Sequence, residues 1–262
     1  MSDTTPGLVA ELWYAEPVDL SRPEILAALR VIAPEAEAQS ESIVVPHAAA
    51  VDGRPPLMSA VMAASAVVHG GKQRPDVSQT WDWPEAADAV EASRASLLVT
   101  EMFADTSDPE ERVAAVDAVV AALVPVTDPL LVSWPQSQRV VDPRHEAADD
   151  LDGVINVRMF TVAGDDTALV MDTLGLHVFG LPDVQCHFRD RLPAEIAALL
   201  YSTAVYLFES GDVIADGNTV SGADGDGRFV CRHEPALVGP ARTVVDVDLG
   251  DPYAAGTRDR DR

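Results

Sequence analysis

Residues 8–34 read LVAELWYAEPVDLSRPEILAALRVIAP. Apolar side chains recur at every second position over the first eight residues, which predicts a β-strand with one face on a core. In Ser21-Arg-Pro-Glu24, a serine stands three residues before a glutamate, the capping-box pattern of a helix start. Ile25, Leu29 and Ile32 then follow at helical spacing until Pro34. The stretch therefore predicts a strand at residues 8–15 followed directly by a helix.

The same alternation of strands and helices continues through the first hundred residues. Three more strand patterns follow, at Ile43–Val45, Leu57–Val68 and Leu97–Val99. Two more helix starts are predicted, at Asp82-Trp-Pro-Glu85 and Ser107-Asp-Pro-Glu110. The order of elements over residues 8–103 matches a ferredoxin-like βαββαβ unit. We therefore expect a ferredoxin-like α+β half at residues 1–141, ending after a strand at Leu130–Trp134.

The second half of the chain has a different pattern. Asp142–Asp152 is acidic and polar and predicts a boundary or a long loop. Beyond it we expect a hairpin around Gly164, a turn at Gly180-Leu-Pro-Asp183, a helix ending near Gly211 and several short strands. Residues 153–250 are thus predicted to form a second α+β half with a mostly antiparallel sheet. Residues 251–262 carry too little apolar content to pack and predict a flexible tail.

The charge of the chain restricts its partners. Asp and Glu number 43 against 18 Lys and Arg, so the formal net charge is −25. Such a charge repels phosphate backbones and anionic lipids, which disfavours nucleic acid and membrane surfaces as partners. A macromolecular partner would instead be a basic protein, unless the charge serves only to keep the chain soluble. With two cysteines, no signal-peptide pattern and no apolar run of membrane length, we expect a cytoplasmic protein.

Three short segments have incomplete site motifs. Gly70-Gly71-Lys72 lacks the earlier glycine and the following Ser or Thr of a phosphate-binding loop. His145-Glu146-Ala-Ala-Asp149 has an aspartate where a zincin helix has its second histidine, and Asp224-Gly-Asp-Gly227 lacks the spacing of a calcium loop. No cofactor and no metal site is therefore predicted.

The two cysteines each lie close to a histidine, in Cys186-His187 and Cys231-Arg-His233. Adjacent side chains on a strand point to opposite faces, so Cys186 and His187 cannot easily share a metal ion. Buried structural cysteines are the favoured interpretation. The alternative is a hydrolase that pairs a thiol with an imidazole, Cys186 with His233 or Cys231 with His187.

Three of the four tryptophans fall at predicted element ends, together with glutamine side chains. Tryptophan offers a large rigid contact area with a polar tip, which suits a recognition surface. The candidate binding surface comprises Gln79, Trp81, Trp83, Trp134 and Gln136. The alternative is that these rings only complete the core.

The segment Gly175-Leu-His-Val-Phe-Gly-Leu-Pro-Asp-Val-Gln-Cys-His-Phe188 resembles the Gly-Leu…Gly-Leu-Pro-Asp/Glu signature of the uncharacterised bacterial DUF4261 domain family. Val99-Thr-Glu-Met-Phe103 and the strand end at Trp134 are similar to it as well, and the likeness runs from about Leu8 to Val247. The family is loosely linked to suppressor-of-fused-like immunity proteins and implies no catalytic residues. The resemblance favours a non-enzymatic, protein-binding or immunity-like module over an enzyme.

Overall fold

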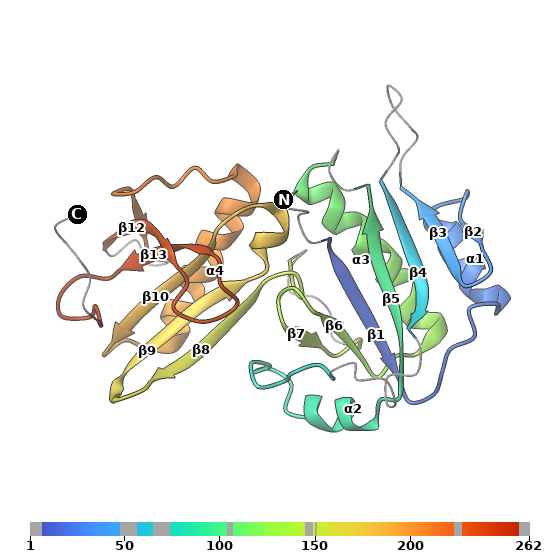
Figure 1. Ribbon diagram of the computed structural model, residues 1–262, viewed down its shortest axis with the longest axis horizontal. Helices are drawn as coiled ribbons and strands as arrows, with labels where there is room; N and C mark the ends of the chain where they lie inside the picture. Colours follow the sequence, from blue (N-terminus) through green and yellow to red (C-terminus); the bar gives the residue numbers. More distant parts are fainter. Residues whose placement is uncertain are drawn as a thin grey trace. The chain divides into compact units, whose positions relative to one another are not determined.

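The computed structural model describes residues 7–47, 57–64, 74–103, 107–144, 149, 151–222 and 227–256. The chain divides into two compact units, Met1–Val154 and Ile155–Arg262, called the N-terminal and C-terminal units below (Figure 1). Each unit combines a mostly antiparallel sheet with α-helices, so the predicted α+β class is confirmed.

The N-terminal unit is built on an antiparallel sheet whose described strands follow the spatial order β2-β3-β4-β5-β1-β6-β7. The strands are β1 (Val9–Tyr14), β2 (Glu37–Ala38), β3 (Ser42–Pro46), β4 (Met58–Ala64), β5 (Ala95–Met102), β6 (Leu131–Trp134) and β7 (Arg139–Val141). The strand predicted at residues 8–15 is confirmed as β1, which pairs with β5 on one side and with β6 on the other.

Helices α1 (Pro23–Ile32) and α3 (Pro109–Thr127) pack on each other, and α3 covers one face of this sheet (Figure 1). The even-numbered residues of β1 point to that face because side chains alternate along a strand. Leu12 is fully buried there, and the Tyr14 hydroxyl lies 2.9 Å from Oγ1 of Thr127 on α3. Burial raises the pKa of Tyr14, so its hydroxyl stays protonated in this contact.

The opposite face of the same sheet carries a smaller hydrophobic cluster. Trp13 of β1 packs there with Leu131, Val140 and Val90, the last of these on α2 (Ala86–Ala92). Trp83 packs against this cluster from the loop before α2. The loop with two tryptophans is thereby held against β6 and β7.

The ferredoxin-like arrangement is not confirmed. In a split βαβ unit, the two strands that flank a helix run parallel and leave room for a third strand between them. Here β4 and β5 flank α2, yet they are direct antiparallel neighbours. The sequence predicts the elements, but their pairing depends on contacts distant in the chain.

The predicted capping boxes are wrong in detail. Helix α1 starts at Pro23 with Arg22 as its N-cap, and no side chain caps it. The carboxylate of Asp19 instead accepts the backbone N–H of Ser21. Helix α3 does have a side-chain cap, but Asp108 supplies it, by accepting the N–H of Glu111 at 2.9 Å. A proline is favoured at the first helical position, so the residue before it becomes the N-cap: Arg22 in α1 and Asp108 in α3, each one position after the predicted serine.

The C-terminal unit has a second sheet, in the spatial order β11-β12-β13-β10-β9-β8. Its elements are β8 (Asn156–Val162), β9 (Asp165–Leu174), the 3₁₀ turn η2 (Leu176–Phe179), β10 (Asp183–Arg189), α4 (Pro193–Ser210), β11 (Thr219–Ser221), β12 (Arg228–Pro235) and β13 (Thr243–Asp248). Only β10 and β13 pair in parallel among these strands. Helix α4 packs on β8, β9 and β10 (Figure 1). The predicted hairpin around Gly164 and the helix ending before Gly211 are confirmed.

The predicted turn at Gly180 requires a glycine-like backbone. Gly180 follows η2 with φ of 73°, and no atom lies within 4 Å of the position a Cβ would take. Gly180→Ala should therefore cost the left-handed strain alone, about 1–2 kcal/mol of unfolding free energy. Gly180→Asn should cost less, because asparagine tolerates this region. Equal thermal melting of the alanine variant and the wild type would contradict this account of the turn.

Part of the predicted tail is ordered. The carbonyl of Tyr253 accepts the N–H of Arg189, and Ala255 donates to the carbonyl of His187. Ala254 forms a β-bridge with Phe188. Residues 253–255 therefore pair with the C-terminal end of β10, because hydrogen bonds to a strand can hold a segment of low apolar content.

Several predicted features lie partly or wholly outside the described residues. These are the Gly70-Gly71-Lys72 motif, His145–Ala148 of the zincin-like segment, residues 65–68 of the third predicted strand, residues 224–226 of the Asp-Gly turn and the last six residues. Among the helices that are described, none combines the length and the apolar character needed to span a bilayer.

Candidate functional site

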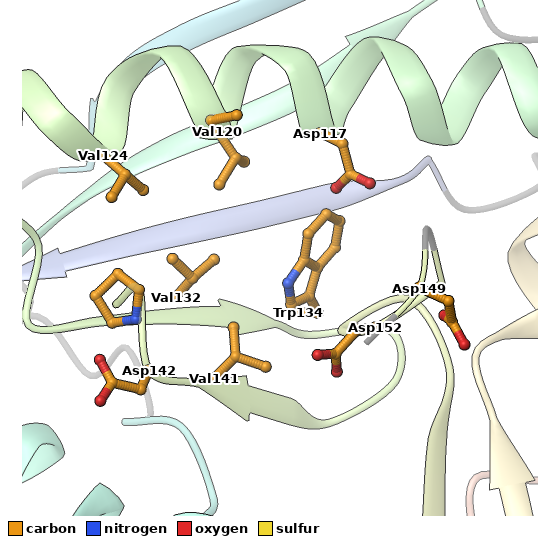
Figure 2. A pocket seen from close by; sticks show the side chains of 11 residues that line it. Asp117, Val120, Val124, Val132, Trp134, Val141, Asp142, Asp149 and Asp152 are labelled. Atoms are coloured by element: carbon orange, nitrogen blue, oxygen red, sulfur yellow. The ribbon is translucent and has the colours of Figure 1, made fainter. Parts of the chain in front are cut away.

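The N-terminal unit contains a cavity of about 410 Å³ between α3 and the β6–β7 hairpin (Figure 2). Its walls are apolar, and carboxylates surround them. Of the described residues that line it, four are aspartates and none is basic. The lining is Asp117, Val120, Ala121, Val124, Val132, Trp134, Val141, Asp142, Pro143, Asp149 and Asp152.

Two elements supply the apolar walls. Val120 and Val124 lie one turn apart on α3 and point toward β6 in Figure 2. Val132 of β6 and Val141 of β7 are directly paired across the two strands, so their side chains share the face that α3 covers. The valine side chains from the helix and the hairpin thus face each other across the cavity.

Trp134 ends β6 and lines the cavity with its indole, although only 2% of the residue is exposed. Figure 2 shows the ring between α3 and the segment that carries Asp152, with Asp117 above it. Gly153 lies against the other part of the ring. A Cβ at Gly153 would come within 2.3 Å of Nε1 of Trp134, and the φ of Gly153 is 93°. The indole is therefore held in place by a backbone that only glycine fits.

Ser137 fixes the same corner by hydrogen bonds. Its hydroxyl lies 2.5 Å from the carbonyl of Gly153, and the backbone N–H of Arg139 donates to its Oγ. Ser137 is fully buried. The turn between β6 and β7 is thus tied to the segment that provides Asp149 and Asp152.

Arg139 of β7 connects the cavity with the tryptophan-bearing loop. Its guanidinium donates to both carboxylate oxygens of Asp82, at 2.8 and 2.7 Å, and to Asp152 at 3.2 Å. Burial disfavours the charged form, but the hydrogen bonds and charges of Asp82 and Asp152 outweigh it and raise the pKa of Arg139. Arg144 likewise donates to both carboxylate oxygens of Asp142, which lines the cavity.

The structure brings most of the predicted binding residues to this region. Trp81 is 55% exposed, Trp83 and Gln79 are half-buried, and Trp134 is buried at the cavity. The two segments meet through the Asp82–Arg139 ion pair, since Arg139 lies opposite Trp134 across the hairpin. Gln136 is half-buried, and its amide oxygen and nitrogen have no hydrogen-bond partner within the described structure. Trp81 is thus the one predicted tryptophan with a largely exposed ring.

Two further hollows lie along β7. One of about 160 Å³ is lined by Asp82, Trp83, Arg139 and Val140, and it shares Val141 and Asp142 with the cavity. Another, of about 490 Å³, shares Val140 with that hollow and includes Glu11 and Asp76. Strand β7, the last described strand at this edge of the sheet, therefore has hollows along its length.

The cysteines and histidines of the alternative hydrolase are placed in the C-terminal unit. Cys186 and Cys231 are free and buried. Burial raises the pKa of Cys231 to about 11, so this thiol is neutral near pH 7 and is a poor nucleophile. The ring of His233 lies 2.9 Å from Asp216 and 3.1 Å from Asp212. Burial disfavours its charge, but these two carboxylates raise the pKa of His233 overall.

The hydrogen bonds of His233 and Cys231 disfavour the two thiol–imidazole pairs of the alternative hydrolase, Cys186 with His233 and Cys231 with His187. Both nitrogens of His233 are occupied by aspartates, and the Cys231 sulfur contacts the carbonyl of Phe229 at 3.8 Å. His187 lies against Gly256, where a Cβ would come within 2.6 Å of its Nδ1. No group of three or more potential metal ligands (His, Cys, Asp or Glu) is found in the described part of the chain.

A row of polar side chains crosses the sheet of the C-terminal unit. Directly paired residues on five neighbouring strands form it: Arg158 of β8, Asp172 of β9, Gln185 of β10, Asp246 of β13 and Arg232 of β12. Arg158 donates to both oxygens of Asp172, at 2.9 and 2.6 Å, and Gln185 donates to Asp246 at 3.2 Å. Asp172 and Gln185 are fully buried. Partners on adjacent strands thus compensate much of the cost of burial.

Arg242 extends this network to the predicted Gly-Leu-Pro-Asp turn. Its guanidinium donates to Asp172 and to Asp183, each at 2.8 Å. Asp183 in turn accepts the N–H of Leu176, which starts η2. The aspartate of the turn is therefore a buried anion that positions η2 and the loop before β13.

This network lies almost entirely within the segment of the chain that matches a family model. Residues 172–248 match a family model described as Domain of unknown function (DUF4261). The DUF4261 match contains every member of the network except Arg158, and it includes the Gly180–Asp183 turn that carries the predicted resemblance. Comparison with curated proteins and with solved structures gave no match.

Sequence reasoning missed two sets of residues. Around the cavity it missed Arg139 and Asp117, and it assigned Asp142, Asp149 and Asp152 to a boundary loop. In the DUF4261 segment it missed the buried charges. Single aspartates flanked by apolar residues, as in Val170-Met-Asp-Thr-Leu174 and Val244-Val-Asp-Val247, were the available signal.

Proposed function

We propose that this chain is a non-enzymatic, cytoplasmic protein-binding module whose N-terminal unit binds a basic protein. The observation that carries the proposal is the cavity beside Trp134, where apolar walls are bordered by four aspartates and by no basic residue of the described lining. The exposed ring of Trp81 lies on the loop that Asp82 joins to the same hairpin. Together these features form an acidic binding surface, defined by the cavity, Asp82 and Trp81.

Charge and aromatic area would serve different stages of binding. A net charge of −25 accelerates the encounter with a basic partner over distances comparable to the Debye length. The ring of Trp81 provides rigid apolar area that slows dissociation after docking. The bacterial, immunity-like role implied by the DUF4261 resemblance fits this division, since an immunity protein must bind its toxin rapidly and release it slowly.

No specific observation favours the alternative hydrolase. The high pKa of Cys231 and the aspartate partners of His233 weaken the pairs that include those residues. Neither a cofactor nor a metal is required for the proposed binding. Nucleic acid and membrane surfaces are disfavoured as partners by the charge.

Trp81→Ala should weaken partner binding by about 2 kcal/mol, mainly through faster dissociation, if the ring is a hot spot. The variant should melt like the wild type because the ring is 55% exposed. Trp83→Ala is the less suitable test, since Trp83 packs on the Trp13 cluster and its loss should destabilise the unit. The partner is first isolated by pull-down and purified, and its dissociation rate is then measured by surface plasmon resonance.

Val31→Ala provides the matched control. Val31 is 83% exposed on α1 in the same unit and does not line the cavity. Both variants remove an exposed apolar side chain, so a difference between their dissociation rates would come from a specific contact between Trp81 and the partner. Equal dissociation rates for Trp81→Ala, Val31→Ala and the wild type would remove Trp81 from the binding surface.

A further inference from the structure

We infer that the cavity beside Trp134 receives a single lysine or arginine side chain from the basic partner. This inference rests on the proposed function and specifies which chemical group enters the N-terminal unit. Lysine and arginine combine a long apolar stem with a terminal cation. The cavity offers a matching surface for each part, because its walls are apolar and carboxylates surround them.

The apolar part of the cavity suits the stem. Val120 and Val124 from α3 face Val132 and Val141 from the hairpin (Figure 2). The volume of about 410 Å³ lies within the range of sites that enclose small organic groups. Contact with valine methyls removes the stem from water, which contributes favourably to binding.

The polar part suits the cation. Asp117, Asp142, Asp149 and Asp152 reach the cavity from α3, from the end of β7 and from the following segment. Arg139 pairs with Asp152 and Arg144 with Asp142, so the four described aspartates and these two arginines together carry a formal charge of −2. The indole of Trp134 adds a π surface that attracts a cation. An incoming guanidinium or ammonium would thus find both charge and aromatic partners.

The surroundings favour a polypeptide over a small free amine as the source of this cation. The hollow formed by Asp82, Trp83 and Arg139 shares Val141 and Asp142 with the cavity. A chain that places one side chain in the cavity can therefore continue along β7 toward Trp83. A free amine would use only the cavity.

Ala121→Met tests insertion without altering charge. Ala121 is exposed on α3 and lines the cavity, so methionine fills the space while helix propensity stays similar. Ala114→Met is the matched control, because Ala114 is exposed on the same helix and does not line the cavity. The probe is a capped peptide of alternating glycine and arginine at low ionic strength. A second peptide carries citrulline, which is neutral and nearly isosteric with arginine.

Binding is followed by NMR of the Trp134 indole N–H and the methyls of Val120, Val124 and Val141. The arginine peptide should shift these resonances saturably, and the citrulline peptide should not. Ala121→Met should weaken the arginine peptide about tenfold, while Ala114→Met binds like the wild type. Thermal melting of both variants confirms that they are folded.

The outcomes separate insertion from the broader proposal. Wild-type affinity of Ala121→Met for the arginine peptide would overturn insertion but leave a salt-dependent acidic surface. No binding of the arginine peptide to the wild type would overturn both insertion and the binding of a basic protein. Arginine amide that binds the cavity as tightly as the peptide would overturn the polypeptide source.

Discussion

Asp172→Ala is expected to destabilise the C-terminal unit by about 3–5 kcal/mol. Asp172 is fully buried, and it accepts hydrogen bonds from Arg158 and from Arg242. Its removal leaves Arg158 with a desolvated positive charge and deprives Arg242 of one of its two carboxylate partners. Neither guanidinium can lose its proton, so the cost is not relieved by neutralisation.

Hydrogen exchange measured by mass spectrometry can assign this loss to the unit. The amides of β9, β10 and β13 should exchange faster in Asp172→Ala by the factor that corresponds to the lost free energy. Asp166→Ala is the matched control, because Asp166 is exposed on the same strand and should change stability by less than about 0.5 kcal/mol. Exchange in Asp172→Ala as slow as in this control would show that the network contributes little.

Gly153→Ala is expected to destabilise the N-terminal unit by about 3 kcal/mol, the combined cost of left-handed strain and overpacking. The added methyl would meet Nε1 of the Trp134 indole at 2.3 Å, a distance so short that the ring or the backbone must shift. All four tryptophans of the chain lie in the N-terminal unit. Denaturant unfolding followed by tryptophan fluorescence therefore reports on this unit alone.

Gly164→Ala separates the two contributions to this loss. Gly164 has φ of 85°, but nothing lies within 4 Å of its Cβ position. It should cost about 1–2 kcal/mol, from the backbone alone, as measured by circular dichroism. A loss for Gly153→Ala no greater than for Gly164→Ala would mean that the Trp134 corner relaxes freely, and the cavity would then be less rigid than described.

Local patterns in the sequence predicted local structure well. The alternation over residues 8–15 and the helical stripe from Ile25 to Ile32 correspond to β1 and α1. The ferredoxin-like order was not confirmed. Strand β5 pairs with both β1 and β4, and these pairings join residues that are dozens of positions apart in the chain, so no local pattern predicts them. The capping boxes failed because a proline at the first helical position made Arg22 and Asp108, instead of the preceding serines, the N-cap residues.

The candidate site was predictable in part. Trp81 and Trp134 were identified because tryptophans at element ends are unusual. Arg139 could not be identified, since its partners Asp82 and Asp152 are remote in the chain and meet only after folding. The same holds for Arg242 and Asp172, whose hydrogen bond joins residues 70 positions apart. Ion pairs between residues distant in the chain form only in the folded sheet, so no local pattern in the sequence predicts them.

The most direct test of the central proposal is the association rate constant with the purified partner, measured from low to high ionic strength. The proposed acidic surface predicts a steep fall in the association rate as salt rises, with a much smaller change in the dissociation rate. Asp117→Asn, which removes one charge at the cavity, should reduce this salt dependence. An association rate that stays constant from low to high ionic strength would contradict binding of a basic protein through this surface.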